Sequence, residues 1–119
     1  MNEIIEVIES YNEYIRKIPQ GVMYIANCLR EDQLNEALLT IKDFSEGVIW
    51  LSDASELLKK NDIEVELNIE QIQAFLIEIN TSLEKQDFLL VADLFEYEIV
   101  PFFENVMLIN KKKKKNQIE

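Results

Sequence analysis

Apolar residues recur every three or four positions along most of the chain, which is the spacing of one face of an α-helix. In the first thirty residues this stripe consists of Ile4, Ile8, Tyr11, Ile15, Ile18, Val22, Ile25 and Leu29. Only Pro19 and Gly21 interrupt it. Because an interior proline removes a backbone donor whereas a first-turn proline is tolerated, we expect a break or sharp kink near residues 18–21, with a helix over about 3–17 and another over about 20–30.

The next stripe predicts a long helix over about 33–60. Its members are Leu34, Ala37, Ile41, Phe44, Val48, Leu51, Ser55 and Leu58. Asp32 is the expected N-cap, because its carboxylate can accept from the unpaired amides of the first turn. Beyond this helix the period is lost, and Ile63, Val65 and Leu67 alternate with polar residues. A single strand has no partner here, so an extended linker lying on the bundle is expected.

Two further helices complete the pattern. Asn68 followed by Gln71 resembles a capping box and opens a helix to about residue 85. Asp87 opens the last helix, in which Pro101 is expected to cause a kink; its stripe is Phe88, Ala92, Phe95, Ile99, Phe102, Val106 and Ile109. Short connections between long amphipathic helices favour antiparallel neighbours. The predicted fold is therefore all-α, an antiparallel four-helix bundle with the first helix broken near Pro19.

Charge is distributed unevenly along the chain, which has 23 acidic and 12 basic residues and a net charge of −11. Five lysines form one run near the C-terminus, Lys111, Lys112, Lys113, Lys114 and Lys115. Residues 111–119 are too polar to pack and are expected to form a disordered tail. The predicted single domain, residues 1–110, is left with a net charge of −15. A body this acidic repels phosphate backbones, so we expect no nucleic-acid binding by the folded part.

The residue types present exclude several kinds of chemistry. The chain has no histidine and one cysteine, Cys28. The absence of histidine excludes Ser-His-Asp and Cys-His catalysis and histidine-ligated zinc. A lone cysteine forms no intrachain disulfide and fits a reducing compartment, so a cytoplasmic location is expected. The N-terminus lacks signal-peptide features, and the longest uncharged stretch, 18–29, is too short for a transmembrane segment.

Carboxylates three residues apart recur along the predicted helices, as in Glu3/Glu6, Asp43/Glu46, Asp53/Glu56 and Asp93/Glu96. Two such pairs facing each other in a bundle could hold Mg²⁺ through oxygen ligands, as in all-α nucleotide pyrophosphatases, and this hydrolase is the alternative function. In so acidic a chain such pairs also arise by chance on solvated faces. We therefore expect no catalytic residue, metal site, cofactor or enzyme activity. Glu96 differs from the others because it adjoins the apolar stripe, and partial burial is expected for it.

The helix predicted over 33–60 carries a second apolar stripe on a different face, made of Gly47, Trp50, Ala54 and Leu57. These residues cannot share one seam with the core stripe of the same helix. Either the first helical region covers this face, or it is a groove open to a protein partner or to a second copy of the chain. In the second case Trp50 and Leu57 are expected to be substantially exposed in the monomer.

The apolar end of the last helix leads directly into the lysine run. An apolar helix end with adjacent polybasic charge is one way to bind anionic membranes or polyanions, and this is a further alternative function. The lysines otherwise form a solvated tail that complements the negative end of the helix dipole. Because the tail can bury almost no apolar area, it is expected to be dispensable for folding.

Two segments resemble a known group of proteins: residues 44–51, Phe-Ser-Glu-Gly-Val-Ile-Trp-Leu, and residues 87–101, which begin Asp-Phe-Leu-Leu-Val and end Glu-Ile-Val-Pro. The group consists of small, acidic, all-helical, uncharacterised proteins from Gram-positive bacteria, and the resemblance spans residues 20–106. Some of their genes lie near motility genes, which implies an accessory or chaperone-like role and no catalytic residue. Together with the surplus apolar stripe, this favours a non-enzymatic helical protein-interaction module.

Overall fold

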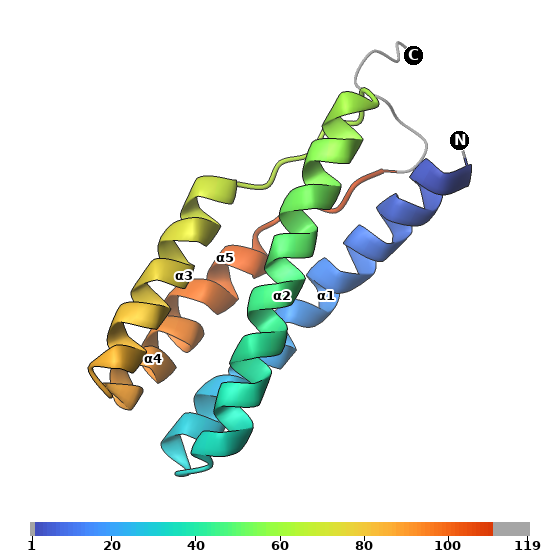
Figure 1. The fold of residues 1–119 in the computed structure, drawn as a ribbon. Coiled ribbons are helices and arrows are strands. Elements are labelled where there is room, and N and C mark those ends of the chain that lie inside the picture. Colours follow the sequence, from blue (N-terminus) through green and yellow to red (C-terminus); the bar gives the residue numbers. More distant parts are fainter. Residues whose placement is uncertain (1, 111–119) are drawn as a thin grey trace.

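The computed structural model describes residues 2–110 (Figure 1). Every regular element in that range is helical, so the predicted all-α bundle is confirmed. The elements are α1 Asn2–Arg30, α2 Leu34–Lys60, α3 Ile69–Glu84, α4 Phe88–Leu94, the π-helix η1 Phe95–Ile99 and α5 Val100–Glu104. The last three follow one another without interruption and form one rod. The lysines at 111–115, with the disorder and polyanion contact expected of them, lie outside the described residues.

The helices form an up-and-down arrangement. α1 and α2 lie side by side and antiparallel, joined by a tight turn, and α3 is joined by a tight turn to the rod α4–α5 (Figure 1). Side-chain contacts from Arg30 to Asp93 and from Asn12 to Ile109 show that α1 also runs antiparallel to this rod. α1 is therefore packed between α2 on one side and the rod on the other.

The predicted break near Pro19 is wrong, because α1 continues through Pro19. Side chains on both sides of the proline enter the same core, and none of Ile15, Ile18, Val22 and Ile25 is more than 3% exposed. A proline inside a helix costs about 3 kcal/mol, whereas burial of one such side chain contributes about 1.5–3 kcal/mol. A break would turn half of this stripe away from the core, so packing outweighs the proline penalty.

The prediction that Asp32 caps α2 is also wrong. Asp32 has a left-handed φ of 60°, and the N-cap is Gln33, whose side chain makes no capping hydrogen bond. The Gln33 N–H donates to the Cys28 carbonyl over 2.9 Å, which is the hydrogen bond of a Schellman motif that closes α1. Asp62 and Gln86 have φ values of 64° and 59° at the ends of α2 and α3. Glycine is the usual residue in this left-handed position after a helix. Both glycines of the chain lie inside helices, so non-glycine residues occupy the position here.

The last helix ends at Glu104, so the predicted continuation to Ile109 is wrong. The irregularity expected at Pro101 lies immediately before it, in η1. The Val100 N–H donates to the Phe95 carbonyl, five residues back, in the wide turn of a π-helix. Pro101 then occupies the first turn of α5, where the missing N–H costs little.

The local predictions around α3 and α4 are confirmed. Asn68 and Asp87 are the N-caps of the two helices, and each side chain accepts from the backbone N–H three residues later. The linker before Asn68 has no regular secondary structure and lies on the bundle, with Ile63, Val65 and Leu67 all buried. The alternation of apolar and acidic residues therefore places one side of the linker in the core and the other in solvent.

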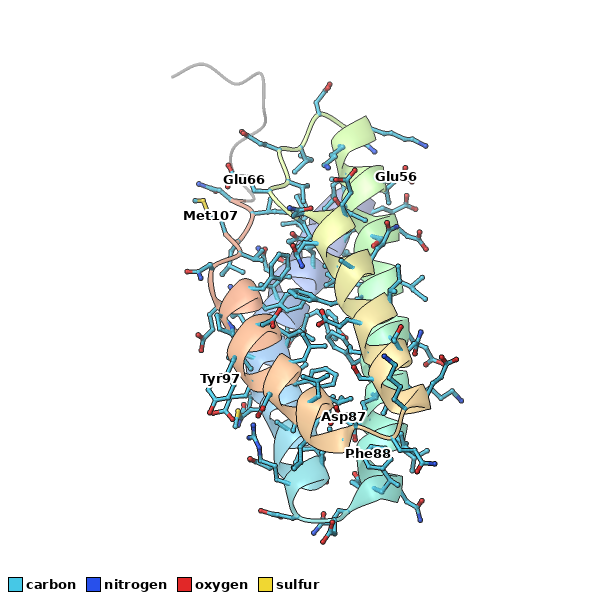
Figure 2. All side chains as sticks on the ribbon, turned by 90° about the vertical axis from the view of Figure 1, so that its left-hand side faces the viewer. Glu56, Glu66, Asp87, Phe88, Tyr97 and Met107 are labelled. Carbon is cyan, nitrogen blue, oxygen red and sulfur yellow. The ribbon has the colours of Figure 1, made fainter. Side chains whose placement is uncertain are left out.

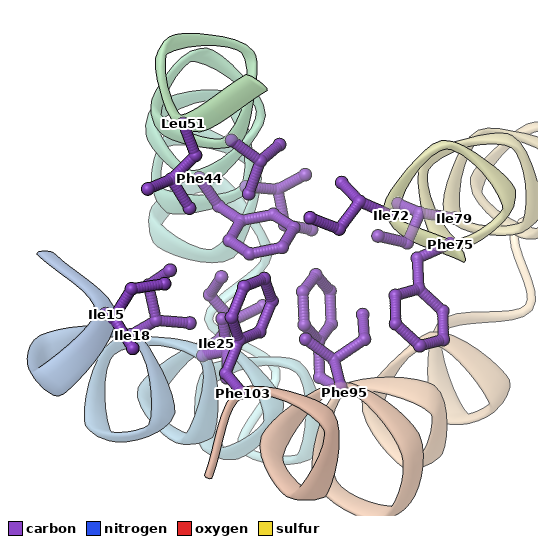
Figure 3. Close-up of a cluster of buried hydrophobic side chains, with 14 of the residues drawn as sticks. Ile15, Ile18, Ile25, Phe44, Leu51, Ile72, Phe75, Ile79, Phe95 and Phe103 are labelled. Atoms are coloured by element: carbon purple, nitrogen blue, oxygen red, sulfur yellow. The ribbon is translucent and has the colours of Figure 1, made fainter. Parts of the chain in front are cut away.

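Aromatic rings from three sides of the bundle meet in the core (Figure 3). Phe44 of α2 packs edge-to-face against Phe95, with ring centroids 5.5 Å apart, and against Phe103, at 6.3 Å. Phe75 of α3 makes the same kind of contact with Phe102 at 5.4 Å. Such pairs contribute about 0.5–1.5 kcal/mol beyond the apolar area they bury. They bind α2 and α3 to the C-terminal rod.

After α5 the chain continues along α1, where the Asn12 side chain binds its backbone. Asn12 Nδ2 donates to the Ile109 carbonyl over 2.8 Å, and the Ile109 N–H donates to Asn12 Oδ1, also over 2.8 Å. Both residues are buried. We call this pair of hydrogen bonds the Asn12 clasp, because it attaches the C-terminal segment to α1 across 97 positions of sequence.

The Tyr11 hydroxyl is buried and has no hydrogen-bond partner among residues 2–110. Burial raises the pKa of Tyr11 from 10.0 to about 12. Because the folded-state pKa is the higher one, ionisation of Tyr11 leaves the free energy of unfolding unchanged below pH 10. It lowers the free energy of unfolding as the pH rises from 10 towards 12. Tyr11→Phe is expected to raise the free energy of unfolding at neutral pH by about 1 kcal/mol, since it removes an unpaired buried hydroxyl, and to reduce the alkaline loss.

Urea unfolding at neutral pH and near pH 11 measures both effects of Tyr11→Phe. Tyr97→Phe is the control, because Tyr97 is 66% exposed and projects from the surface of η1 (Figure 2). It should leave both values unchanged. Destabilisation by Tyr11→Phe at neutral pH would show that the hydroxyl is paired.

Candidate functional site

The second apolar stripe of α2 lies beside α1, and its four residues differ in exposure. Trp50 and Leu57 are 39% and 43% exposed. Ala54 is buried, and Gly47 is half-buried. The large side chains of the stripe are therefore exposed, as a partner surface requires, whereas its small residues are partly or fully buried.

Tyr14 of α1 lies directly against Gly47 of α2. A Cβ atom on Gly47 would lie 1.7 Å from Tyr14 Oη and 2.4 Å from Cζ, so the ring occupies the space of the missing side chain. Tyr14 also contacts Trp50 edge-to-face, with ring centroids 6.3 Å apart and an interplanar angle of 83°. Burial and the charge of Asp43 raise the pKa of Tyr14. Gly47 thus allows Tyr14 to hold Trp50 in place.

These rings border a surface hollow of about 380 Å³, which we call the tryptophan hollow. Its lining residues are Ser10, Glu13, Tyr14, Lys17, Gly47 and Trp50. Lys17 and Glu13 form an exposed ion pair at 3.6 Å. Because exposed pairs of this kind contribute little to stability, a ligand could separate these two side chains at small cost.

A second hollow, of about 280 Å³, opens beside the first at Gly21 of α1. We call it the glycine hollow, and it is lined by Tyr14, Lys17, Ile18, Gly21, Val22, Ile25, Thr40, Asp43 and Phe44. A Cβ atom on Gly21 would have no atom within 4 Å. The aliphatic lining residues and Phe44 belong to the buried core, so the absent side chain leaves the core itself as the floor of the hollow.

The two hollows share Tyr14 and Lys17 and form one depression along the seam of the two helices, the α1–α2 groove. From the sequence, Gly21 is expected only to interrupt the first helix, and the glycine hollow is not predicted. The signal that could have located it is an adjoining stripe on α1 that shares Ile18 and Ile25 with the core stripe. It steps by four, three, four and three through Tyr14, Ile18, Gly21, Ile25 and Cys28. Gly21 is the one member of that stripe without a side chain.

Asp93 and Glu96, the acidic pair nearest the core, lie against Arg30 of α1. Arg30 Nη2 donates to Asp93 Oδ1 over 2.8 Å, and Nη1 donates to Glu96 Oε1 over 2.5 Å. Glu96 is half-buried, as predicted. These two hydrogen bonds raise the pKa of Arg30, and they tie α4 and η1 to the end of α1.

Within residues 2–110, no group of three or more His, Cys, Asp or Glu side chains is placed to hold a metal ion. None of the helices in this range is both long and apolar enough to cross a membrane. Cys28 is buried, and its Sγ lies 3.7 Å from Gln33 Oε1.

A family model described as a domain of unknown function, DUF8042, matches residues 6–109. No curated protein and no solved structure matches the chain. The matched range includes every residue that lines the two hollows and both partners of the Asn12 clasp.

Proposed function

This chain belongs to the DUF8042 family, and we propose that it is a non-enzymatic protein-interaction module that binds a protein partner along the α1–α2 groove. The observation that carries the proposal is the groove itself, in which an exposed Trp50 stands beside a hollow floored by the core. The proposal includes the finer expectations from the sequence: a bacterial, cytoplasmic, accessory or chaperone-like protein with a role in motility.

Tryptophan and tyrosine are the side chains most often found at the energetic centre of protein interfaces. Here Tyr14 and Trp50 are already packed against each other before any partner binds. A partner would therefore lose little free energy in ordering them. Leu57 lies on the same stripe of α2, two turns beyond Trp50, and extends the apolar surface along the helix.

The alternative functions have less support. A magnesium-dependent hydrolase needs free carboxylates that face one another, whereas Asp93 and Glu96 are engaged by Arg30. Binding of anionic membranes or polyanions by the lysine tail concerns residues outside the described range. We therefore keep protein binding through the groove as the proposed function.

Site-specific photo-crosslinking in the native cells tests this proposal. A photoreactive phenylalanine analogue at position 50 is expected to capture a discrete partner. The same analogue at position 77 is the control, because Ile77 lies on α3 outside the groove and is 67% exposed. Binding of the purified partner should then weaken about tenfold or more in Trp50→Ala and stay unchanged in Ile77→Ala. Equal capture from both positions, or none from position 50, would refute the proposal.

A further inference from the structure

We infer that the occupant of the α1–α2 groove is a basic amphipathic helix of the partner protein, with one large aliphatic side chain seated in the glycine hollow. This inference rests on the proposed function and specifies the chemistry of the partner. It follows from the shape of the glycine hollow, the spacing of the two hollows and the charge around them.

The glycine hollow fits a single side chain that enters from outside. Its floor is formed by buried core residues, among them Ile18, Val22 and Phe44. The position above Gly21 is open to solvent and free of neighbouring atoms within 4 Å. In packed helices, a side chain of one helix fills a hole between residues of its neighbours in this way. A leucine or methionine of a partner would cover the part of the core that Gly21 leaves open.

The spacing of the two hollows favours a helix as the partner segment. Tyr14, which packs against Trp50, and Gly21, above which the glycine hollow is open, lie seven residues apart on α1. Seven residues are two helical turns, or about 10 Å along the axis. A helix lying in the seam presents its own residues i and i+7 on one face at the same spacing. One such residue would meet the glycine hollow and the other would meet Trp50.

Charge favours a basic partner over a second copy of the chain. Residues 1–110 carry a net charge of −15. Carboxylates line both hollows, Glu13 in one and Asp43 in the other, and the single cation between them, Lys17, is paired with Glu13. A cationic helix therefore meets a groove with more carboxylates than cations on an acidic domain, whereas a second copy brings the same negative net charge and is repelled.

Synthetic peptides test the inference with the full-length chain. Trp50 is the only tryptophan of the chain, so its fluorescence reports directly on the groove. The first peptide is a helix of about 18 residues with leucines at i and i+7 and lysines on the other faces. In the second peptide both leucines are replaced by alanine, and in the third every lysine is replaced by glutamate. The first peptide is expected to bind, and the other two to bind about tenfold more weakly or worse.

Filling the glycine hollow from within is the matched test on the protein side. Gly21→Leu is expected to weaken binding of the first peptide about tenfold or more, and Ile77→Ala should leave it unchanged. Gly21→Met is a second filling variant, and circular dichroism checks that both variants remain folded. Unaltered binding by both folded variants, or equal binding of the acidic peptide, would overturn the inference.

The failure of this inference can be told apart from failure of the proposed function. If position 50 still captures a partner in cells while the peptide results are negative, only the chemistry assigned to the partner is refuted. Sedimentation of the full chain tests whether the groove instead binds a second copy of the chain. A dimer that Gly21→Leu abolishes would assign the groove to a second copy and also overturn the inference.

Discussion

Asn12→Ala is expected to lower the free energy of unfolding by about 2–4 kcal/mol, because it removes both hydrogen bonds of the Asn12 clasp and leaves a buried N–H and a buried carbonyl of Ile109 unpaired. The loss is limited by detachment of the segment after Glu104, which would return these groups to water. Urea unfolding measures the change in stability, and hydrogen exchange at the Ile109 amide measures the detachment.

Two further substitutions sharpen this test. Asn12→Asp keeps the shape of the side chain, but its ionised carboxylate cannot donate to the Ile109 carbonyl and buries a charge, so a large loss that shrinks at acidic pH is expected. Asn105→Ala is the control, because the Asn105 side chain makes an exposed hydrogen bond to the Pro101 carbonyl, and a change within about 0.5 kcal/mol is expected. If Asn12→Ala were as stable as Asn105→Ala, the clasp would contribute nothing.

The two glycines of the chain are expected to respond to alanine with opposite signs. Gly47→Ala should lower the free energy of unfolding by about 1–3 kcal/mol, since its Cβ would overlap the Tyr14 ring, which must then move. Gly21→Ala should raise it by about 0.5–1 kcal/mol, because alanine is the better helix former and meets no atom within 4 Å. Thermal and urea unfolding of the two variants provide the comparison.

A double-mutant cycle identifies the cause of the Gly47 effect. In a Tyr14→Ala background the ring is absent, so Gly47→Ala is expected to become neutral or stabilising through its helix propensity. The same background should leave the effect of Gly21→Ala unchanged in sign. Equal destabilisation by Gly47→Ala with and without Tyr14 would show that the ring is not the obstacle.

The sequence predicts those parts of the fold that depend on neighbouring residues. The caps Asn68 and Asp87 act on amides three residues away, and both are identified correctly. Pro19 and Asp32 are misjudged because their local preferences are opposed by packing: the core stripe holds α1 together across the proline, and Asp32 is needed to close α1 with a left-handed turn. The stripe through Ile109 is misread because Val106 and Ile109 keep helical spacing and pack against the core although the segment that carries them is irregular and otherwise exposed.

In the candidate site, too, only the features that lie within one helix can be predicted from the sequence. Trp50 and Leu57 belong to one helix, so their displacement from the core stripe is visible in the sequence. The glycine hollow exists only because α1 and α2 pair with Gly21 opposite Thr40 and Asp43, and no local pattern contains that pairing. The Asn12 clasp joins residues 97 positions apart, and a single asparagine on an amphipathic helix gives no indication of its partner.

The π-helix η1 has an evolutionary consequence, because such a turn is equivalent to one residue inserted into an α-helix. Removing one residue from 95–99 would restore regular α-helical geometry and keep Phe103 on the face it now shares with Phe95, since seven residues are close to two whole turns. Pro101 would then lie in the interior of a continuous α-helix, where its ring clashes with the preceding turn. The length of the segment 95–99 and the presence of Pro101 are therefore coupled. Family members with one residue fewer in this segment are expected to lack the proline as well.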